Sequence, residues 1–488
     1  MKLNELLAGV PVTVHRTEES MDIKRLCCDS RKVCPGDAFF ALPGVLSDGH
    51  DYVQSARAAG ACLIVAERDN EIEGAVAVTP DTHKALAMMA ANFHGHPAAS
   101  LRMTGVTGTN GKTTVTHILK GIYERVYGEP VGLIGTNAIR IGTHTFAAER
   151  TTPDAIGLQS ILHEMVDAGC KRCVMEVSSH ALAQARTWGI QYNQGLFLNL
   201  TQDHLDYHRD MEDYFTAKAQ LFAQSDVSIL NLDDEYGRRL AQTGDNTVTF
   251  SARENQADVT AKNIRLKRDR VEFEAVTTSQ IARIEWATPG LFSVYNALAA
   301  VTAALTEGLS LHDISAAIRE VPPVGGRMEV VPGPPDVTIV IDYAHTPDAI
   351  SNLLSAARGT QDGRIITLFG CGGDRDHGKR PLMAQAAARG SDLLVVTSDN
   401  PRNEKPMDII NDILAGLPED APDVIVEENR VEAIARALRE ARPGDLVLLC
   451  GKGHETYQEI GGQRFPLDER TVISELVGST AKGNLEYA

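Results

Sequence analysis

The feature that most constrains the fold is a regular alternation of short apolar runs with segments long enough to form helices. In the middle of the chain the apolar runs lie within residues 101–108, 173–179, 194–201 and 226–234. The alternation is clearest near the end, within residues 337–345, 364–376, 392–402, 423–430 and 445–455. Short apolar strands separated by helices are typical of parallel sheets. The sequence therefore predicts an α/β protein.

The length of 488 residues predicts about three domains at roughly 150 residues each. The first hundred residues contain strand-like runs at 37–44 and 61–67 and a helical pattern at 81–93. A new series of apolar runs begins near Leu101. Residues 321–336 are dense in Pro and Gly, which favours a hinge. We therefore expect a small N-terminal α/β domain (1–98), a central parallel-sheet domain (99–325) and a C-terminal domain (326–488).

Composition predicts a soluble globular protein that avoids polyanions. Lys plus Arg number 47 against 65 Asp plus Glu, a net charge of −18 that repels nucleic acid and anionic lipid, so neither is an expected partner. The uncharged segment 286–306 contains Pro289 and Gly290 and predicts a loop followed by a buried helix, not a membrane span. Eight scattered cysteines, with no zinc partner for the Cys170–Cys173 pair, favour a reducing cytoplasm.

A glycine-rich loop follows the run at 101–108 and precedes a helical segment. Backbone N–H groups of such a loop bind phosphate, a following lysine adds positive charge, and a threonine hydroxyl can ligate Mg²⁺. The loop departs from the general GxxxxGK[ST] pattern, because Val106 stands where the first glycine would be. It still predicts ATP binding by Gly108, Thr109, Asn110, Gly111, Lys112, Thr113 and Thr114.

Polar residues follow the predicted strands and should meet at one edge of each sheet, where ligands of open α/β sheets bind. In the central domain Glu176 ends a strand and, with the Thr113 hydroxyl, makes a plausible Mg²⁺ site. His204 and His208 could instead suggest zinc, but a third ligand is missing. In the last domain the polar clusters are Asp342 and His345, Asp374 and Arg375, Asp399 to Arg402, Arg430, and Lys452 to Glu455.

Eleven ordered motifs give the chain a more specific resemblance. They are TGTNGKTT (107–114), CDSRKVCPGDAFFAL (28–42), ERTTPD (149–154), MEVSSHAL (175–182), LNLTQDHLDYH (198–208), the lysine of YFTAKAQLF (214–222), GRME (326–329), IDYAHTPD (341–348), GCGGDRDHGKRP (370–381), DNPR (399–402) and GKGHE (451–455). The chain resembles the Mur ligases, ATP-dependent amide-forming enzymes of cell-wall precursor synthesis. This resemblance implies a uridine-nucleotide domain, a central ATPase and a C-terminal Rossmann-like domain for the incoming amino acid, in a monomer.

The resemblance also implies roles for particular residues. Lys112, Glu176, His204 and Lys218 would be catalytic, with Lys218 carbamylated by CO₂ and two Mg²⁺ ions held by Thr113, Glu176, His204 and the carbamate. Without the resemblance, Lys218 would be interpreted as an exposed lysine of a helix. ATP would also contact Asn296, Arg327 and Asp342. Their alternative roles are a polar residue of a helix, a hinge charge and a strand-end cap.

Among the Mur ligases, the resemblance is greatest to those that add meso-2,6-diaminopimelate to UDP-MurNAc-L-Ala-D-Glu. It implies that the muramoyl dipeptide nucleotide contacts Cys28, Ser30, Val45, Leu46, Ser47, Arg150, Thr151, Thr152, Ser178, Gln184 and Arg186. Thr152 before Pro153 could equally be a helix N-cap. Diaminopimelate would contact Arg375, Asp399, Asn400, Pro401, Arg402, Gly451 and Glu455.

Arg402 favours diaminopimelate over L-Lys, because a guanidinium can pair bidentately with the extra distal carboxylate. Lysine-adding relatives tend to carry a small residue there. The alternatives are a ligase for L-Lys, a folylpolyglutamate synthase, a P-loop NTPase or kinase, and a catalytically silent nucleotide-binding regulator. Asp399-Asn-Pro could also be a simple turn.

Overall fold

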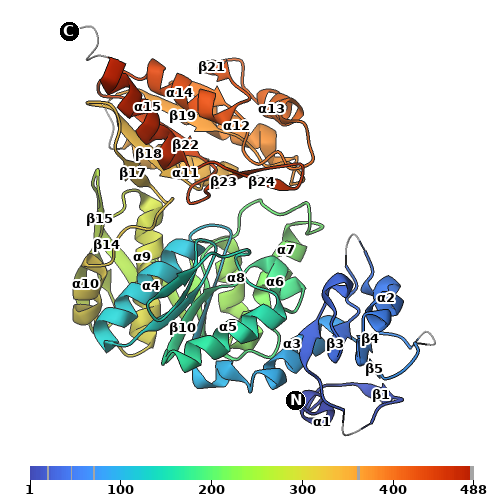
Figure 1. Ribbon diagram of the computed structural model, residues 1–488. Helices are drawn as coiled ribbons and strands as arrows, with labels where there is room; N and C mark the ends of the chain where they lie inside the picture. Colours follow the sequence, from blue (N-terminus) through green and yellow to red (C-terminus); the bar gives the residue numbers. More distant parts are fainter. Residues whose placement is uncertain (19–20, 45–46, 70–71, 360–362, 484–488) are drawn as a thin grey trace. The chain divides into compact units, whose positions relative to one another are not determined.

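The computed structural model describes residues 1–18, 21–44, 47–69, 72–359 and 363–483 (Figure 1). They form two compact units, described separately below. The first comprises Met1–Thr107, Tyr127–Leu196 and Ala217–Ser228, and the second comprises Gly108–Val126, Phe197–Thr216 and Ile229–Ala488. Among the described residues, no helix combines the length and hydropathy needed to span a membrane.

The first unit begins with a five-stranded sheet in the order β1-β5-β4-β3-β2, parallel except for the β1–β5 pair. Buried residues on both faces of β4 fit an apolar run between two helical layers. The strands predicted within 37–44 and 61–67 and the helix predicted at 81–93 are confirmed. The elements are α1 (Leu3–Leu6), β1 (Thr13–His15), β2 (Arg25–Cys27), β3 (Asp37–Phe40), α2 (Val53–Ala58), β4 (Leu63–Ala66), β5 (Val76–Val78) and α3 (Thr82–Phe93).

The first unit also contains strands in the order β11-β6-β10-β7-β8-β9. β6, β10 and β7 are parallel, as expected, but β8 and β9 add an antiparallel extension that the apolar runs did not predict. These short strands are partly exposed, so they lack a continuous apolar run. The elements are β6 (Arg102–Thr107), β7 (Val131–Ile134), β8 (Ile139–Ile141), β9 (His144–Phe146), α5 (Ala155–Asp167), β10 (Arg172–Glu176), α6 (Ser179–Ala183) and β11 (Tyr192–Phe197).

In the second unit, helix α4 follows the glycine-rich loop, and strands lie in the order β16-β15-β14-β13-β12. The pairs β14–β15 and β15–β16 are antiparallel, so antiparallel strands extend the predicted parallel sheet at this end. The buried helix α9 packs against β13, β14 and β15, which confirms the loop and helix predicted within 286–306. The elements are α4 (Lys112–Tyr127), α7 (Met211–Ala219), β12 (Ser225–Asn231), α8 (Glu235–Thr243), β13 (Thr247–Ser251), β14 (Val259–Leu266), β15 (Val271–Val276), β16 (Ile281–Trp286), α9 (Leu291–Thr306) and α10 (Leu311–Arg319).

The chain ends in a six-stranded sheet in the order β17-β18-β22-β19-β20-β21, with β17 antiparallel and the other strands parallel. Val340 of β18 packs on the α11–α13 side, while Ile339 and Ile341 pack on the α14–α15 side, as strand alternation requires. All five predicted strands are confirmed. β17 (Glu329–Val331) lies in the segment predicted as a hinge, so that part is an edge strand.

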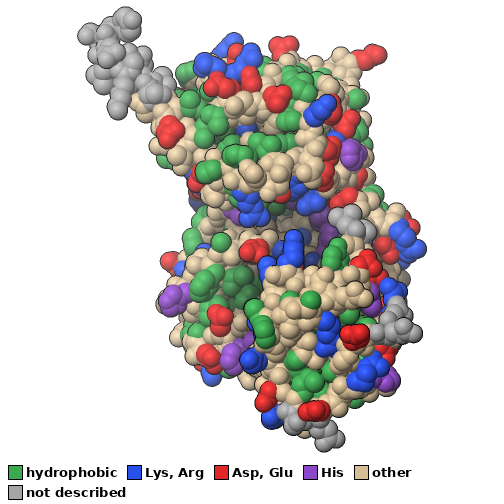
Figure 2. Space-filling model, turned by 45° about the vertical axis from the view of Figure 1, so that its right-hand side comes forward, with side chains coloured by type: hydrophobic (Ala, Val, Ile, Leu, Met, Phe, Trp, Pro, Cys, Tyr) green, Lys and Arg blue, Asp and Glu red, His purple; other side chains and the backbone are tan. Residues whose placement is uncertain are grey.

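The rest of this region alternates strands with helices along the chain. The strands are β18 (Thr338–Asp342), β19 (Ile365–Phe369), β20 (Leu393–Val396), β21 (Asp423–Val426) and β22 (Leu446–Cys450), and a separate hairpin contains β23 (Tyr457–Ile460) and β24 (Gln463–Pro466). The helices are α11 (Pro347–Arg358), α12 (Lys379–Gly390), α13 (Pro406–Leu414), α14 (Arg430–Glu440) and α15 (Glu469–Gly483). On the face drawn in Figure 2, acidic and basic side chains are interspersed.

Candidate functional site

The glycine-rich loop is held in place by the segment that follows β11. The backbone N–H of Thr109 donates to the carbonyl of Asn199 at 3.0 Å, and that of Asn110 donates to the Asn199 side chain at 2.8 Å. Gly111 has a φ of +88°, and a Cβ there would collide with Oδ1 of Asn296 on α9. Glycine at this position is therefore required both by backbone conformation and by the close approach of Asn296.

Lys112 begins α4 and folds back over the loop. Its Nζ donates to the carbonyls of Gly108 at 2.8 Å and Thr109 at 2.9 Å. An ammonium group at the N-terminus of a 16-residue helix adds to the positive end of the helix dipole. The loop is therefore suited to an anionic ligand such as a phosphate.

Arg327 reaches the same loop from the start of the last domain. Its Nη2 donates to Oγ1 of the buried Thr113 at 3.1 Å. Its Nε is buried and has no hydrogen-bond partner among the described residues, so the guanidinium keeps an unused donor beside the loop. Asp342 accepts from the backbone N–H groups of Met328 and Ala344, both at 2.7 Å. Asp342 thus caps the strand end, and burial raises the pKa of its carboxyl.

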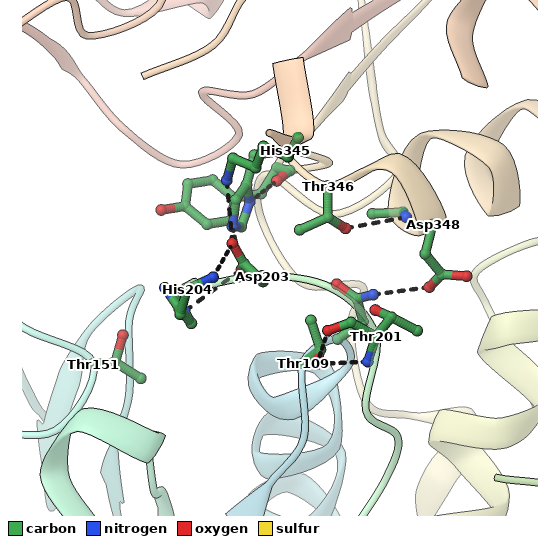
Figure 3. Close-up of polar contacts among 12 residues, drawn as sticks. Thr109, Thr151, Thr201, Asp203, His204, His345, Thr346 and Asp348 are labelled. Carbon is green, nitrogen blue, oxygen red and sulfur yellow. Dashed lines mark hydrogen bonds and ion pairs between the residues drawn. The ribbon is translucent and has the colours of Figure 1, made fainter. Parts of the chain in front are cut away.

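Asp203 connects the loop after β11 to two residues of the last domain (Figure 3). Its carboxylate lies 3.2 Å from Nζ of Lys379 and 3.7 Å from Nε2 of His345. It also lies 3.5 Å from Nε2 of His204, whose backbone has a φ of +58°. Burial alone would raise the pKa of Asp203, but the charges of His204, Lys379 and His345 hold it well below its usual value.

Tyr214 of α7 lies between the glycine-rich loop and the two histidines. Its hydroxyl is 3.3 Å from Oγ1 of Thr109, and its ring contacts both His204 and His208. His208 is buried, and its Nδ1 lies 3.5 Å from Asp213. Within the described ranges, no group of three His, Cys, Asp or Glu side chains is arranged to hold a metal ion.

In the first unit, Glu176 ends β10 with its side chain fully buried. Its carboxylate accepts from the backbone N–H of Thr136 at 2.8 Å and from the Thr136 hydroxyl at 3.1 Å. That hydroxyl lies 3.0 Å from Oγ1 of Thr151. A Cβ at Gly135 would collide with Glu176, so glycine is needed to admit the carboxylate.

Four predicted substrate residues meet beside this strand end. The Thr152 hydroxyl donates to the carbonyl of Glu176 at 2.9 Å, and its oxygen accepts from the backbone N–H of Ser178 at 3.1 Å. Arg186 donates to the carbonyl of Thr152 at 2.9 Å and to the side chain of Gln184 at 2.6 Å. The alternative role of Thr152 as a helix N-cap is wrong, because Asp154 caps α5 and the helix begins at residue 155.

Lys218 lies in the last turn of α7 and is 1% exposed. Its interpretation as an exposed helix lysine is therefore wrong. Burying an ammonium group is costly unless neighbouring groups compensate for the lost hydration. Whether the Lys218 side chain carries a positive charge therefore affects the stability of the fold.

The other described residues predicted to contact the muramoyl nucleotide lie in loops or turns of the first unit. Cys28 is exposed, Ser30 begins a 3₁₀ turn capped by Asp29, and the carbonyl of Ser47 accepts from the N–H of Gly44 at 3.1 Å. Arg150 is exposed. Val45 and Leu46 lie outside the described residues.

The polar residues at the C-terminal edge of the last sheet come together, as predicted. Nζ of the fully buried Lys452 lies 2.7 Å from Oδ1 of Asn400, 3.0 Å from Glu455 and 3.8 Å from Asp399. Asn400 also donates to Glu455 at 2.9 Å. Burial would raise the pKa of Asp399, but Lys452 and the nearby arginines lower it overall. Gly451 has a φ of +109°, and a Cβ there would collide with Asp399.

Two predicted arginines flank Gly372 at this edge. A Cβ on Gly372 would lie 2.8 Å from Nη1 of Arg402 and 3.6 Å from Cγ of Arg375. Arg402 has a φ of +52° and donates from Nη1 to the carbonyl of Gly373 at 2.7 Å. Pro401 lies beside it, and its carbonyl approaches Gly373 closely. Nε of Arg402 also lies 3.5 Å from Glu459, and Nη1 of Arg375 donates to the carbonyl of Asp374 at 3.0 Å.

Sequence reasoning missed a buried ion network that supports this edge. Arg380 donates to both carboxylate oxygens of Glu404 at 2.8 and 2.9 Å and to Asp412 at 2.8 Å. Glu404 also accepts from the backbone N–H of Asp374. Arg380 belongs to the motif at 370–381, but nothing in the local pattern identifies Glu404 as its partner.

Three family profiles match successive parts of the chain. They are described as Mur ligase family, catalytic domain (residues 22–102), Mur ligase middle domain (106–304) and Mur ligase, glutamate ligase domain (326–453). Two similar curated relatives are named UDP-N-acetylmuramoyl-L-alanyl-D-glutamate--2,6-diaminopimelate ligase. The one from Geobacillus thermodenitrificans is 44% identical, over 98% of this chain and 99% of its own length. The one from Thermosynechococcus vestitus is 45% identical, over 96% of each chain.

Solved structures of Mur ligases are also similar to this chain. A structure of UDP-N-acetylmuramoyl-L-alanyl-D-glutamate--2,6-diaminopimelate ligase is 30% identical, with a TM-score of 0.69 over 99% of both chains. MurF ligase from Thermotoga maritima, solved in complex with ADP, is 20% identical, with a TM-score of 0.62 over 95% of this chain and 98% of its own. The second similarity concerns the fold alone. Together they establish a three-domain α/β fold.

Proposed function

Because the chain belongs to the Mur ligase family, we propose that it joins meso-2,6-diaminopimelate to the D-Glu γ-carboxylate of UDP-MurNAc-L-Ala-D-Glu in an ATP-dependent reaction. Relatives that carry the corresponding name are 40–45% identical over almost the whole chain. The structural observation that carries the proposal is the pair Arg375 and Arg402 beside the Asn400–Lys452–Glu455 cluster. The two arginines would bind carboxylates of diaminopimelate, and Glu455 would bind one of its amines.

The reaction requires an activated carboxylate, because a free carboxylate has no good leaving group. Transfer of the γ-phosphoryl group of ATP to the γ-carboxylate would give an acyl phosphate and ADP. The amine of diaminopimelate would then attack the carbonyl, and inorganic phosphate would leave as the amide forms. Lys112 and the start of α4 would bind and orient the phosphates, and Arg327 would add a second cation. No residue is assigned as the base for the amine.

We propose that Thr113, Glu176, His204 and carbamylated Lys218 hold two Mg²⁺ ions. A threonine hydroxyl, a carboxylate and a carbamate are oxygen donors of the kind that Mg²⁺ prefers, although a histidine is less usual. The buried positions of Thr113, Glu176 and Lys218 fit this donor set. When bound, the ions would neutralise charge on the transferring phosphoryl group. These assignments rest on the motif resemblance.

The substrate contacts are proposed on the same basis. The nucleotide residues are Gly108 to Thr114 with Asn296, Arg327 and Asp342. The muramoyl dipeptide nucleotide would bind Arg150, Thr151, Thr152, Ser178, Gln184 and Arg186, with Cys28, Ser30 and residues 45–47 toward its uridine nucleotide. Arg402 would pair with the distal carboxylate of diaminopimelate and Glu455 with its distal ammonium, while Arg375, Asp399, Asn400, Pro401 and Gly451 complete the site.

We further propose domain boundaries near residues 98 and 325, a monomer, and a cytoplasmic location without nucleic-acid or membrane partners. The uridine-nucleotide domain would precede the ATPase, and the C-terminal domain would present the amine. Separate binding of UDP-muramoyl dipeptide by the segment 1–98 would be a direct test of the first boundary. Sedimentation of the intact chain would test the monomer.

An amino-acid panel tests the proposed function. Purified protein is given ATP, Mg²⁺ and UDP-MurNAc-L-Ala-D-Glu, and phosphate release is followed with meso-diaminopimelate, L-Lys or D-Glu. We expect release with meso-diaminopimelate and little with the others. Release that prefers L-Lys would reject the assigned acceptor, and release without any amino acid would favour a simple NTPase.

A further inference from the structure

Asp203 is a buried carboxylate to which the proposed reaction assigns no role. It lies in the loop between β11 and α7, directly before His204. One oxygen, Oδ1, accepts from the backbone N–H of His204 at 3.0 Å and from Nζ of Lys379 at 3.2 Å. The other, Oδ2, lies within 3.7 Å of the His204 and His345 rings. A carboxylate buried among so many charged partners has a defined orientation.

The position of Lys379 in the fold disfavours its positive charge, so a nearby carboxylate stabilises it. It is the first residue of α12, where the helix dipole disfavours a cation, and its side chain is only 8% exposed. Among residues 1–18, 21–44, 47–69, 72–359 and 363–483, no side chain caps this helix N-terminus. His345 is fixed in turn by its Nδ1, which lies 2.7 Å from the carbonyl of Tyr343. The two residues therefore hold Asp203 from the loop that follows β18 and from the start of α12.

Two further contacts join the same regions. Nδ2 of Asn110, in the glycine-rich loop, donates at 2.9 Å to Asp348, in the first turn of α11. Gln202 donates to Asp376 at 3.4 Å. Asp348, which accepts the bond from Asn110, is labelled in Figure 3 together with Asp203. The starts of α11 and α12 thus both contact loops of the nucleotide site, and Asp203 is the most buried of the contact points.

We propose that Asp203 is a positioning residue that couples the amine-presenting domain to the His204 loop. When Lys379 and His345 engage its carboxylate, the loop is held in the arrangement that places His204 for the reaction. When they disengage, the loop is free to relax. The link to turnover rests on the proposed ligase function, whereas the coupling of the two segments does not.

The test uses the full-length protein and the variants Asp203→Asn, Asp203→Glu, Lys379→Met and the Asp203→Asn/Lys379→Met double variant. Hydrogen exchange is measured on peptides covering residues 199–209 and 371–383, without nucleotide or metal. We expect Asp203→Asn to raise exchange about 10-fold in both segments, and Lys379→Met to do the same. The double variant should add little, because both changes break one contact. Glu212→Gln, in an exposed ion pair with Arg239, is the control and should change neither segment.

Turnover gives the second readout. We expect Asp203→Asn to lower kcat about 100-fold while the KM for ATP changes less than about 3-fold, and Asp203→Glu to recover part of the loss. Increased exchange confined to residues 199–209, or additive effects of the two single changes, would overturn the coupling. An equal rise in KM and fall in kcat would overturn the positioning role. A wild-type protein without ligase activity would reject the proposed function, yet the exchange result would still decide the coupling.

Discussion

Arg327 donates from Nη2 to the hydroxyl of Thr113 at 3.1 Å, a contact between residues 214 positions apart. It brings a guanidinium to the residue that directly follows Lys112 in the glycine-rich loop. In the part of the chain that the structure describes, the buried Nε of Arg327 has no hydrogen-bond partner, which leaves a donor for a ligand beside the loop. The guanidinium also lies 4.6 Å from the Tyr343 ring, which fixes its plane.

Replacing Arg327 should therefore weaken nucleotide binding. In Arg327→Met the Kd for ATP is expected to rise about 10-fold or more, since hydrogen bonds to charged groups contribute roughly 1.5–3 kcal/mol. Isothermal titration calorimetry measures the change. Arg319→Met, which breaks an exposed contact with Glu285, is the matched control and should leave the Kd unchanged. A Kd for Arg327→Met within about twofold of the wild type would contradict the assignment.

Gly111→Ala should abolish tight ATP binding, because a Cβ would collide with Asn296 and the backbone has a φ of +88°. Gly128→Ala separates the two effects. Gly128 has a φ of +66° but open space around its Cβ, so it isolates backbone strain of about 1 kcal/mol. We expect both variants to lose thermal stability and only Gly111→Ala to lose ATP affinity. Normal ATP affinity in Gly111→Ala would show that the loop does not bind the nucleotide.

Arg402→Ala should raise the KM for meso-diaminopimelate about 100-fold, because the distal carboxylate loses a bidentate partner. The Kd for ATP should stay the same. Since Arg402 has a φ of +52°, Arg402→Asn serves as a second variant whose residue tolerates that conformation. Steady-state kinetics with each substrate varied in turn gives both values. Equal losses for the amino acid and for ATP would argue against a role in acceptor binding.

The proposed carbamate on Lys218 has a spectroscopic signature. Protein equilibrated with ¹³C-bicarbonate should give a carbamate carbon resonance that is absent in Lys218→Arg. Lys120→Arg is the control, because Lys120 is also largely buried and pairs with Glu124. It should retain the resonance. A signal that survives Lys218→Arg would place the modification elsewhere.

The pair Arg380 and Glu404 predicts a pH dependence of stability. Hydrogen bonds from Arg380 lower the pKa of Glu404. Glu404 therefore stabilises the fold fully above its unfolded pKa of about 4.3, and this stabilisation is lost as pH falls through the lower folded pKa. Urea unfolding should show Glu404→Gln less stable by about 1–3 kcal/mol at pH 7, with a smaller difference at pH 3. The exposed Glu419→Gln should show no such trend.

Burial on both faces made the parallel strands predictable from sequence. In β22 all five residues are buried, so the segment is a continuous apolar run. The antiparallel strand β16 has an exposed Ile281 and polar residues between its buried ones, so it gives no such run. The sequence left Thr152 open as a helix N-cap or a substrate contact, and Asp154, two residues later, caps α5.

The glycine-rich loop could be located from the sequence, because its residues lie together at 108–114. A contact between residues far apart in the sequence could not. Asp203 and Lys379 are 176 positions apart, and neither local pattern indicates the other. The burial of Lys218 likewise comes from packing around α7 and not from the pattern of that helix.

The most direct measurement of the central claim follows an oxygen atom. UDP-MurNAc-L-Ala-D-Glu labelled with ¹⁸O in both oxygens of the γ-carboxylate is incubated with the protein, ATP, Mg²⁺ and meso-diaminopimelate, and the products are analysed by mass spectrometry. If the carboxylate is activated as an acyl phosphate, each amide formed is accompanied by one ADP and one inorganic phosphate carrying a single ¹⁸O. Amide formation with unlabelled phosphate, or labelled substrate left unchanged while ATP is hydrolysed, would contradict the account.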